Sequence, residues 1–104
     1  MMVARWSIVA KFGYKQDLIK LMEKWVDDVG SQVGFTRDKM RLVTGSIGAL
    51  ESVVQTEHTV SDLAELNATW EKLGKIPAHA QWSKDIEQYV VSGTNKWEIF
   101  RIIG

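Results

Sequence analysis

The sequence of 104 residues contains no cysteine, and its acidic and basic side chains cancel. The absence of cysteine excludes disulfide bonds, thiolate nucleophiles and cysteine-ligated zinc, and it is typical of a reducing compartment. With 13 residues of each sign, the chain lacks the basic character of proteins that bind nucleic acid or anionic membranes. No apolar run approaches the roughly 20 residues of a membrane span, and the N-terminus does not resemble a signal peptide. We therefore expect a cytoplasmic protein with no nucleic-acid or membrane partner.

Histidine is scarce as well. The chain has only His58 and His79, which belong to no H-x-H or H-x3-H pair. A mononuclear metal site normally needs three or four convergent ligands, so the sequence predicts no metal site. It contains no motif for any other cofactor, and we expect none.

Tryptophan, in contrast, is abundant, with five in the chain. Trp6 and Trp97 fall on expected strands, whereas Trp25, Trp70 and Trp82 fall on expected helices. Large aromatic side chains dominate both protein cores and interfaces, which is the simpler interpretation. The alternative is that some of them line a pocket for a flat or apolar ligand.

Hydrophobic periodicity predicts a single domain over residues 1–104, with elements in the order β-α-β-β-α-β. The expected strands cover 3–12, 39–45, 51–60 and 96–103. A first helix is expected over 15–29, and a second begins at a cap formed by Asp62. Gly74 to Pro77 interrupts this second helix, and a further helical piece is expected over 78–90.

This order is that of the α+β, ferredoxin-like fold, in which helices cover one face of a four-stranded antiparallel sheet. The last strand carries apolar residues at both parities, with Trp97 and Ile99 alternating with Phe100 and Ile102. The second sheet face therefore needs a cover, and a second copy of the same sheet would provide it. We expect a homodimer that pairs through this face and an isolated monomer that is unstable. A charged replacement of Ile99 or Trp97 is therefore expected to yield aggregated or unfolded chain.

The glycines of Gly45-Ser46-Ile47-Gly48 raise the question of a phosphate-binding loop. Such a loop follows a strand and leads into a helix, whose N-terminus meets the anion. Here the residues that follow, SVVQTEHTV, are β-branched and alternating, which favours a strand. We therefore predict that this segment connects the two strands of a hairpin.

Several stretches give the chain a family resemblance: SIVAKFG leading into DLIKLMEKW, then VVQTEHTVSDLAELNATWEKLG, and finally QWSKDIEQYVVSGTNKWEIFRII. Together they resemble the dimeric α/β-barrel superfamily, in particular its small NIPSNAP-like and antibiotic-biosynthesis-monooxygenase-like proteins. The resemblance implies sheet-to-sheet dimers and a small-molecule cavity between sheet and helices. Activities in the superfamily range from cofactor-free oxygenation to haem degradation and isomerisation. No catalytic residue set of the family matches this sequence position by position.

Polar residues on strands are the remaining candidates for a site, because buried charges are costly unless they are paired or used. We select Arg5, Trp6, Arg41, Glu57 and His58 as candidate ligand-binding residues. His58 is also the candidate general base, although the adjacent Glu57 should point to the opposite face. The structural alternative is that the arginines pair with glutamates across strands or at the dimer interface.

Three functions fit these observations. The first is a homodimer that binds a small, apolar or aromatic molecule in a cavity between sheet and helices. The second is a cofactor-independent monooxygenase or isomerase acting on an aromatic or polyketide-like compound, with His58 as base. The third is a dimerisation or interaction module without a ligand. A cavity of ligand size would favour the first two, whereas a solid core packed with tryptophan would favour the third.

Overall fold

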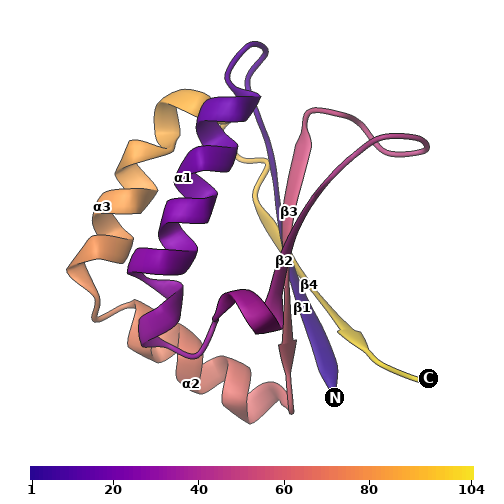
Figure 1. The fold of residues 1–104 in the computed structure, drawn as a ribbon, viewed down its shortest axis with the longest axis vertical. Coiled ribbons are helices and arrows are strands. Elements are labelled where there is room, and N and C mark those ends of the chain that lie inside the picture. Colours follow the sequence, from indigo (N-terminus) through magenta and orange to yellow (C-terminus); the bar gives the residue numbers. More distant parts are fainter.

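The computed structural model describes all residues from 1 to 104 and contains four strands and three α-helices (Figure 1). In chain order these are β1 (Met2–Val9), α1 (Lys15–Asp28), β2 (Met40–Thr44), β3 (Val53–Val60), α2 (Leu63–Leu73), α3 (Pro77–Asp85) and β4 (Lys96–Arg101). Short 3-10 turns follow α1, precede β2 and follow α3. The expected helix over 78–90 is shorter than predicted, since α3 ends at Asp85 and a 3-10 turn covers Glu87–Tyr89.

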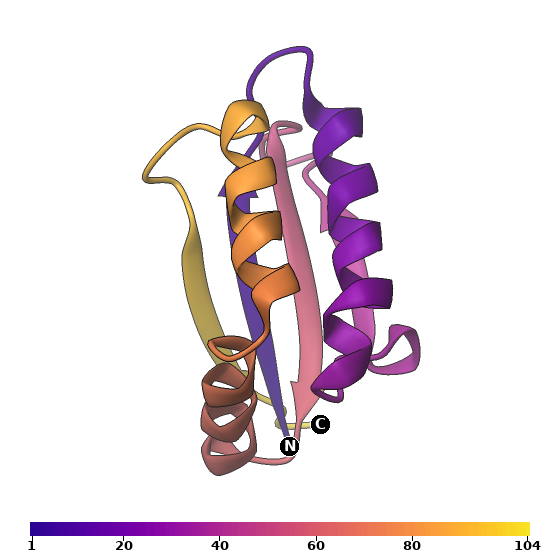
Figure 2. The same cartoon turned by 90° about the vertical axis from the view of Figure 1, so that its left-hand side faces the viewer.

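The four strands form one antiparallel sheet in the order β2-β3-β1-β4. All three helices lie on the same side of this sheet, with α1 and α3 side by side across it and α2 near one end (Figure 1, Figure 2). This arrangement is the ferredoxin-like α+β fold that the element order predicts.

Local sequence signals account for the helix boundaries. The Asp62 side chain caps α2 by accepting a hydrogen bond from the Glu65 N–H, at 2.8 Å. The Glu65 carboxylate in turn accepts from the backbone N–H of Ser61, at 2.5 Å, which satisfies a further donor ahead of the helix. Pro77 occupies the first turn of α3, where its missing N–H has no partner to lose. The predicted cap and the predicted helix break are both confirmed.

The glycine-containing segment connects β2 to β3 in a hairpin, as predicted. The Gly45 N–H donates to the Val53 carbonyl at 3.2 Å, and Gly48 has a φ of 81°, a region that glycine enters without strain. A strand, not a helix, follows the loop. The loop therefore lacks the helix N-terminus that a phosphate site of this kind requires.

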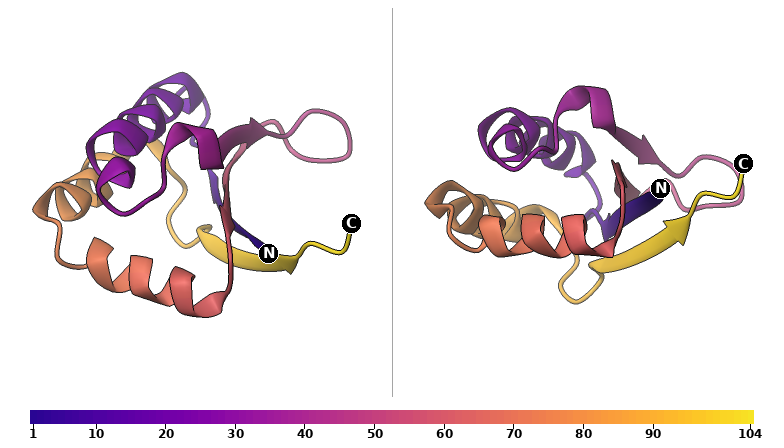
Figure 3. Two further views of the ribbon diagram at one scale, coloured as in Figure 1. Left: turned by 60° about the horizontal axis from the view of Figure 1, so that its bottom comes forward. Right: turned by 90° about the horizontal axis from the view of Figure 1, so that it is seen from below.

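Strand register assigns residues to the two sheet faces. Ala4, Ile8, Val54 and Val60 are buried beneath the helices and belong to the hydrophobic core. Residues of the opposite parity point away from the helices, and no element of the chain covers that face (Figure 3). Trp97 pairs with Trp6, and Ile99 pairs with Ala4. Both are therefore on the helix-facing side, so neither belongs to the face that was expected to form the dimer.

Candidate functional site: a tryptophan-lined pocket

A pocket of about 510 Å³ lies between the sheet and the helices. Ligand-binding cavities commonly measure roughly 300–1,000 Å³, so this pocket can accommodate a small organic molecule. Among the 20 residues that line it are both histidines and all five tryptophans of the chain.

The tryptophans come from five different elements and form the pocket walls. Trp6 of β1 is the direct cross-strand partner of Trp97 of β4, while Trp25, Trp70 and Trp82 come from α1, α2 and α3. The rings of Trp70 and Trp97 meet at 65° with centroids 5.3 Å apart. The ring centroid of Trp82 lies 6.0 Å from those of Trp6 and Trp25, and the ring planes meet at 56° and 54°. The rings therefore meet as adjoining walls and do not form a parallel stack.

Two of the indole N–H groups hold α1 and α3 together. Trp25 Nε1 donates to His79 Nδ1 at 3.0 Å, and Trp82 Nε1 donates to the Leu21 carbonyl at 2.8 Å. His79 therefore accepts at Nδ1, which in the neutral ring places its proton on Nε2. Burial lowers the pKa of His79, so this histidine is neutral at pH 7.

His58 lies deeper in the pocket wall and is only 2% exposed. Its ring stacks on Phe35 with centroids 3.8 Å apart, and neither ring nitrogen forms a hydrogen bond. Burial lowers the pKa of His58 from 6.5 to about 4, an effect that the nearby backbone of Ala4 opposes only in part. His58 is thus neutral at pH 7, and its ring nitrogens are covered by neighbouring atoms.

The remaining polar lining lies mainly on α3 and the segment that leads to β4. It comprises Ser83, Glu87, Ser92 and Asn95, together with Thr56 of β3. Glu87 is the only lysine, arginine, aspartate or glutamate among the lining residues. It is exposed at the 3-10 turn after α3, and it takes part in none of the four ion pairs of the chain.

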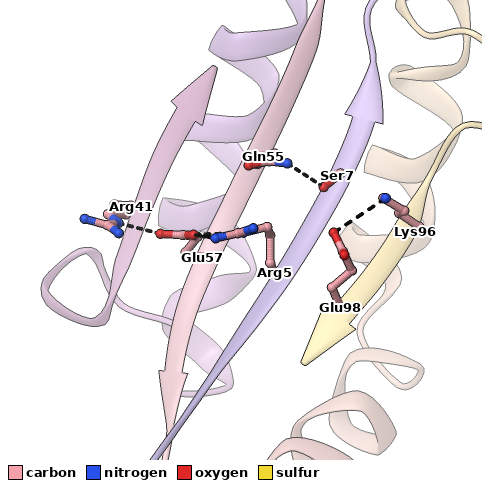
Figure 4. Close-up of polar contacts among 7 residues, drawn as sticks. All are labelled: Arg5, Ser7, Arg41, Gln55, Glu57, Lys96 and Glu98. Atoms are coloured by element: carbon pink, nitrogen blue, oxygen red, sulfur yellow. Dashed lines mark hydrogen bonds and ion pairs between the residues drawn. The ribbon is translucent and has the colours of Figure 1, made fainter. Parts of the chain in front are cut away.

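The five residues selected from the sequence divide between the two faces of the sheet. Trp6 and His58 line the pocket. Arg5, Arg41 and Glu57 lie together on the face away from the helices (Figure 4). The structure therefore brings these residues together as two separate groups, one on each side of the sheet.

On the open face, the Glu57 carboxylate accepts from both arginines. Arg5 Nη2 contacts Oε2 at 2.6 Å, and Arg41 Nε contacts Oε1 at 2.6 Å. Burial alone would raise the pKa of Glu57, but the hydrogen bonds from Arg41 and Arg5 outweigh it and leave the pKa below its ordinary value. The Arg5 guanidinium also lies 4.6 Å from the centre of the Phe100 ring. This arrangement is the cross-strand pairing described above as the structural alternative.

The five residues selected from the sequence omit several lining residues, notably His79 and Glu87, whereas Trp70 and Trp82 were considered only within the alternative that some tryptophans line a pocket. The number of tryptophans was the available signal, and it did not reveal that all five converge.

No group of three or more histidine, aspartate or glutamate side chains is placed to hold a metal ion. No helix combines the length and the apolar character needed to cross a membrane.

No family model matches the chain, and no curated protein matches it either. Several solved structures share its fold. A NIPSNAP domain protein from Burkholderia xenovorans superposes with a TM-score of 0.73 at 17% identity, over 99% of this chain and 95% of the other. An antibiotic biosynthesis monooxygenase superposes with a TM-score of 0.65 at 8% identity, over 100% of both chains.

A third structure, from Bacteroides fragilis, is described as a dimeric protein of unknown function with a ferredoxin-like fold. It superposes with a TM-score of 0.63 at 9% identity, over 97% of this chain and 96% of the other. At these identities the similarity establishes the fold alone. The fold resemblance expected from the sequence is confirmed, because the chain has the ferredoxin-like fold of NIPSNAP domain proteins and antibiotic biosynthesis monooxygenases.

Proposed function

We propose that this protein is a homodimer that binds a small, largely apolar aromatic molecule in the tryptophan-lined pocket. The observation that carries the proposal is the convergence of all five tryptophans on one cavity of about 510 Å³. Tryptophans that served only to fill a core would pack without leaving space of this size, since protein interiors are close-packed. Of the residues selected from the sequence, Trp6 and His58 belong to this proposed site.

A catalytic role is the second candidate, because one similar structure is described as an antibiotic biosynthesis monooxygenase. In such a role His58 would act as the base. With a pKa of about 4, however, it would take a proton from a phenol of pKa about 10 only against about 8 kcal/mol. Its ring nitrogens are also covered. Both observations favour binding over proton abstraction by His58.

The dimer is proposed to form through the open face of the sheet. This face carries the Arg5–Glu57–Arg41 cluster and the half-exposed ring of Phe100, which is 42% exposed. Planar guanidinium groups and aromatic rings are enriched at protein interfaces. The Bacteroides fragilis protein, of the same fold, is described as dimeric, which supports this part of the proposal.

The test of ligand binding is a titration of the ¹⁵N-labelled protein with 1-naphthol, observed by NMR at the five indole Nε1–H signals. Each signal reports on the pocket because every tryptophan lines it. We expect saturable shifts of several indole signals, and weaker binding by Trp97→Leu. Phe12→Leu is the matched control, because Phe12 is fully exposed and lies outside the pocket. Unchanged indole signals at the solubility limit of 1-naphthol would refute the proposed function.

A further inference from the structure

We propose that the ligand is an organic cation, an alkylated ammonium group carried on an apolar or aromatic body. The tryptophan rings would bind the cation, and Glu87 would supply the opposing charge. This inference rests on the proposed function and specifies the charge of the ligand.

The charges around the pocket are the first reason. The chain has 13 lysines and arginines, but none of them lines the pocket. The two lining histidines are neutral at pH 7 because burial lowers the pKa of both. Glu87 therefore contributes a negative charge to a lining that contains no basic residue, and it forms none of the ion pairs of the chain. An anionic ligand would meet this carboxylate without a basic group to hold it.

The arrangement of the aromatic rings is the second reason. The face of an indole ring carries negative potential and attracts cations, most strongly when they are alkylated and weakly hydrated. Trp70 and Trp97 are 37% and 39% exposed, and they meet at 65°. Trp82 stands at a similar angle to Trp6. Faces of rings set at such angles would contact a rounded group, such as trimethylammonium, from more than one side, whereas parallel rings would favour a flat ligand.

The remaining lining suits the uncharged part of such a ligand. Ile8, Met22, Leu73 and Ile86 are buried apolar residues that contribute to the pocket wall. An aromatic or aliphatic body would gain free energy by leaving water for these surfaces. The pocket thus combines an apolar interior with a carboxylate at an exposed position, which is the pattern expected for an amphiphilic cation.

The test compares two ligands that differ only in charge, 3-hydroxyphenyl-trimethylammonium and its neutral isostere 3-tert-butylphenol. Dissociation constants are measured from the indole Nε1–H shifts of the intact protein at pH 7.5 and low salt. We expect the cation to bind at least about ten-fold more tightly than the neutral compound, as desolvated cation–π contacts allow. Glu87→Gln should weaken binding of the cation about three-fold, as loss of a partly exposed ion pair does. The same variant should bind the neutral compound with unchanged affinity.

Glu71→Gln is the matched control, since Glu71 is an exposed residue of α2 outside the pocket and its replacement changes the net charge equally. Equal effects of the two variants on the cation would overturn the role of Glu87. Equal or tighter binding of 3-tert-butylphenol in the wild type would overturn the cation inference while supporting the proposed function. Failure of both compounds and of 1-naphthol to shift the indole signals would overturn both.

Discussion

Replacing His58 with leucine is expected to stabilise the folded chain, and the gain should grow as the pH falls. The ring of His58 is 2% exposed, and both of its nitrogens lack hydrogen-bond partners. Each buried polar group without a partner costs about 1–3 kcal/mol. Leucine has a similar volume and needs no partner, so the variant should be more stable than the wild type even at pH 7.5.

The pH dependence follows from the lowered pKa of His58. The unfolded chain takes up a proton near pH 6.5, whereas the folded chain does so only near pH 4. Between these values the unfolded state binds more protons, so acidification favours unfolding. Protonation of His58 therefore costs the wild type no unfolding free energy above pH 6.5, and the cost grows as the pH falls to 4. The lowering of the His58 pKa from 6.5 to about 4 corresponds to about 3 kcal/mol of unfolding free energy, and the leucine variant is free of this loss.

The measurement is urea-induced unfolding of wild type and His58→Leu from pH 7.5 to pH 4.5, at one fixed protein concentration. Carboxylates and His79 titrate in both proteins, so the difference between the two unfolding free energies isolates His58. His58→Phe is a second variant, which keeps an aromatic ring against Phe35. A difference that stays constant across this pH range would refute the description of His58 as a buried, neutral and unpaired histidine.

Two further predictions concern the open face of the sheet. If the proposed dimer forms through this face, Phe100→Asp should sediment as a monomer, whereas Phe12→Asp, a change at a fully exposed loop residue, should remain a dimer. An unaltered dimer in the Phe100 variant would exclude pairing through this face. Glu57→Gln should lower the free energy of unfolding at pH 7 by about 1–2 kcal/mol, because Arg5 and Arg41 lose their shared carboxylate. Folding lowers the pKa of Glu57, so the wild-type carboxylate becomes protonated and loses its charge only below that lowered pKa. Below it, the wild type and Glu57→Gln should unfold with the same free energy in urea titrations. A stability difference that persists at such a pH would contradict the ion-pair explanation.

Much of the fold follows from local sequence signals. Strand alternation, the Asp62 cap and the break before Pro77 predict the element order and most boundaries to within a few residues. The overestimate for the last helical piece arises because Ile86 and Val90 continue the apolar pattern beyond the end of α3. Ile86 is buried at the C-cap of α3, and Val90 is buried in an isolated bridge to Ala10. Apolar spacing alone does not distinguish these conformations from an α-helix.

The site was less predictable because alternation does not tell which parity faces the helices. Arg5 and Trp6 are neighbours on β1, as are Glu57 and His58 on β3, and neighbouring strand residues point to opposite faces. A set that contained both pairs had to divide between the two sides of the sheet. The stacking of Phe35 on His58 joins segments far apart in sequence, so the lowered pKa of His58 could not be foreseen from its neighbours in the chain.

The attachment of α3 has a consequence for the motions of the protein. None of its residues is fully buried, and the two indole hydrogen bonds to α1 are its most specific anchors. The strands, in contrast, are held by continuous ladders on either side of β1. Segments with few buried contacts open at a lower free energy than a central sheet. We therefore expect α3, which carries Trp82 and His79, to separate from the rest of the fold at a lower free energy than the central strands, and such a separation would widen the entrance to the cavity.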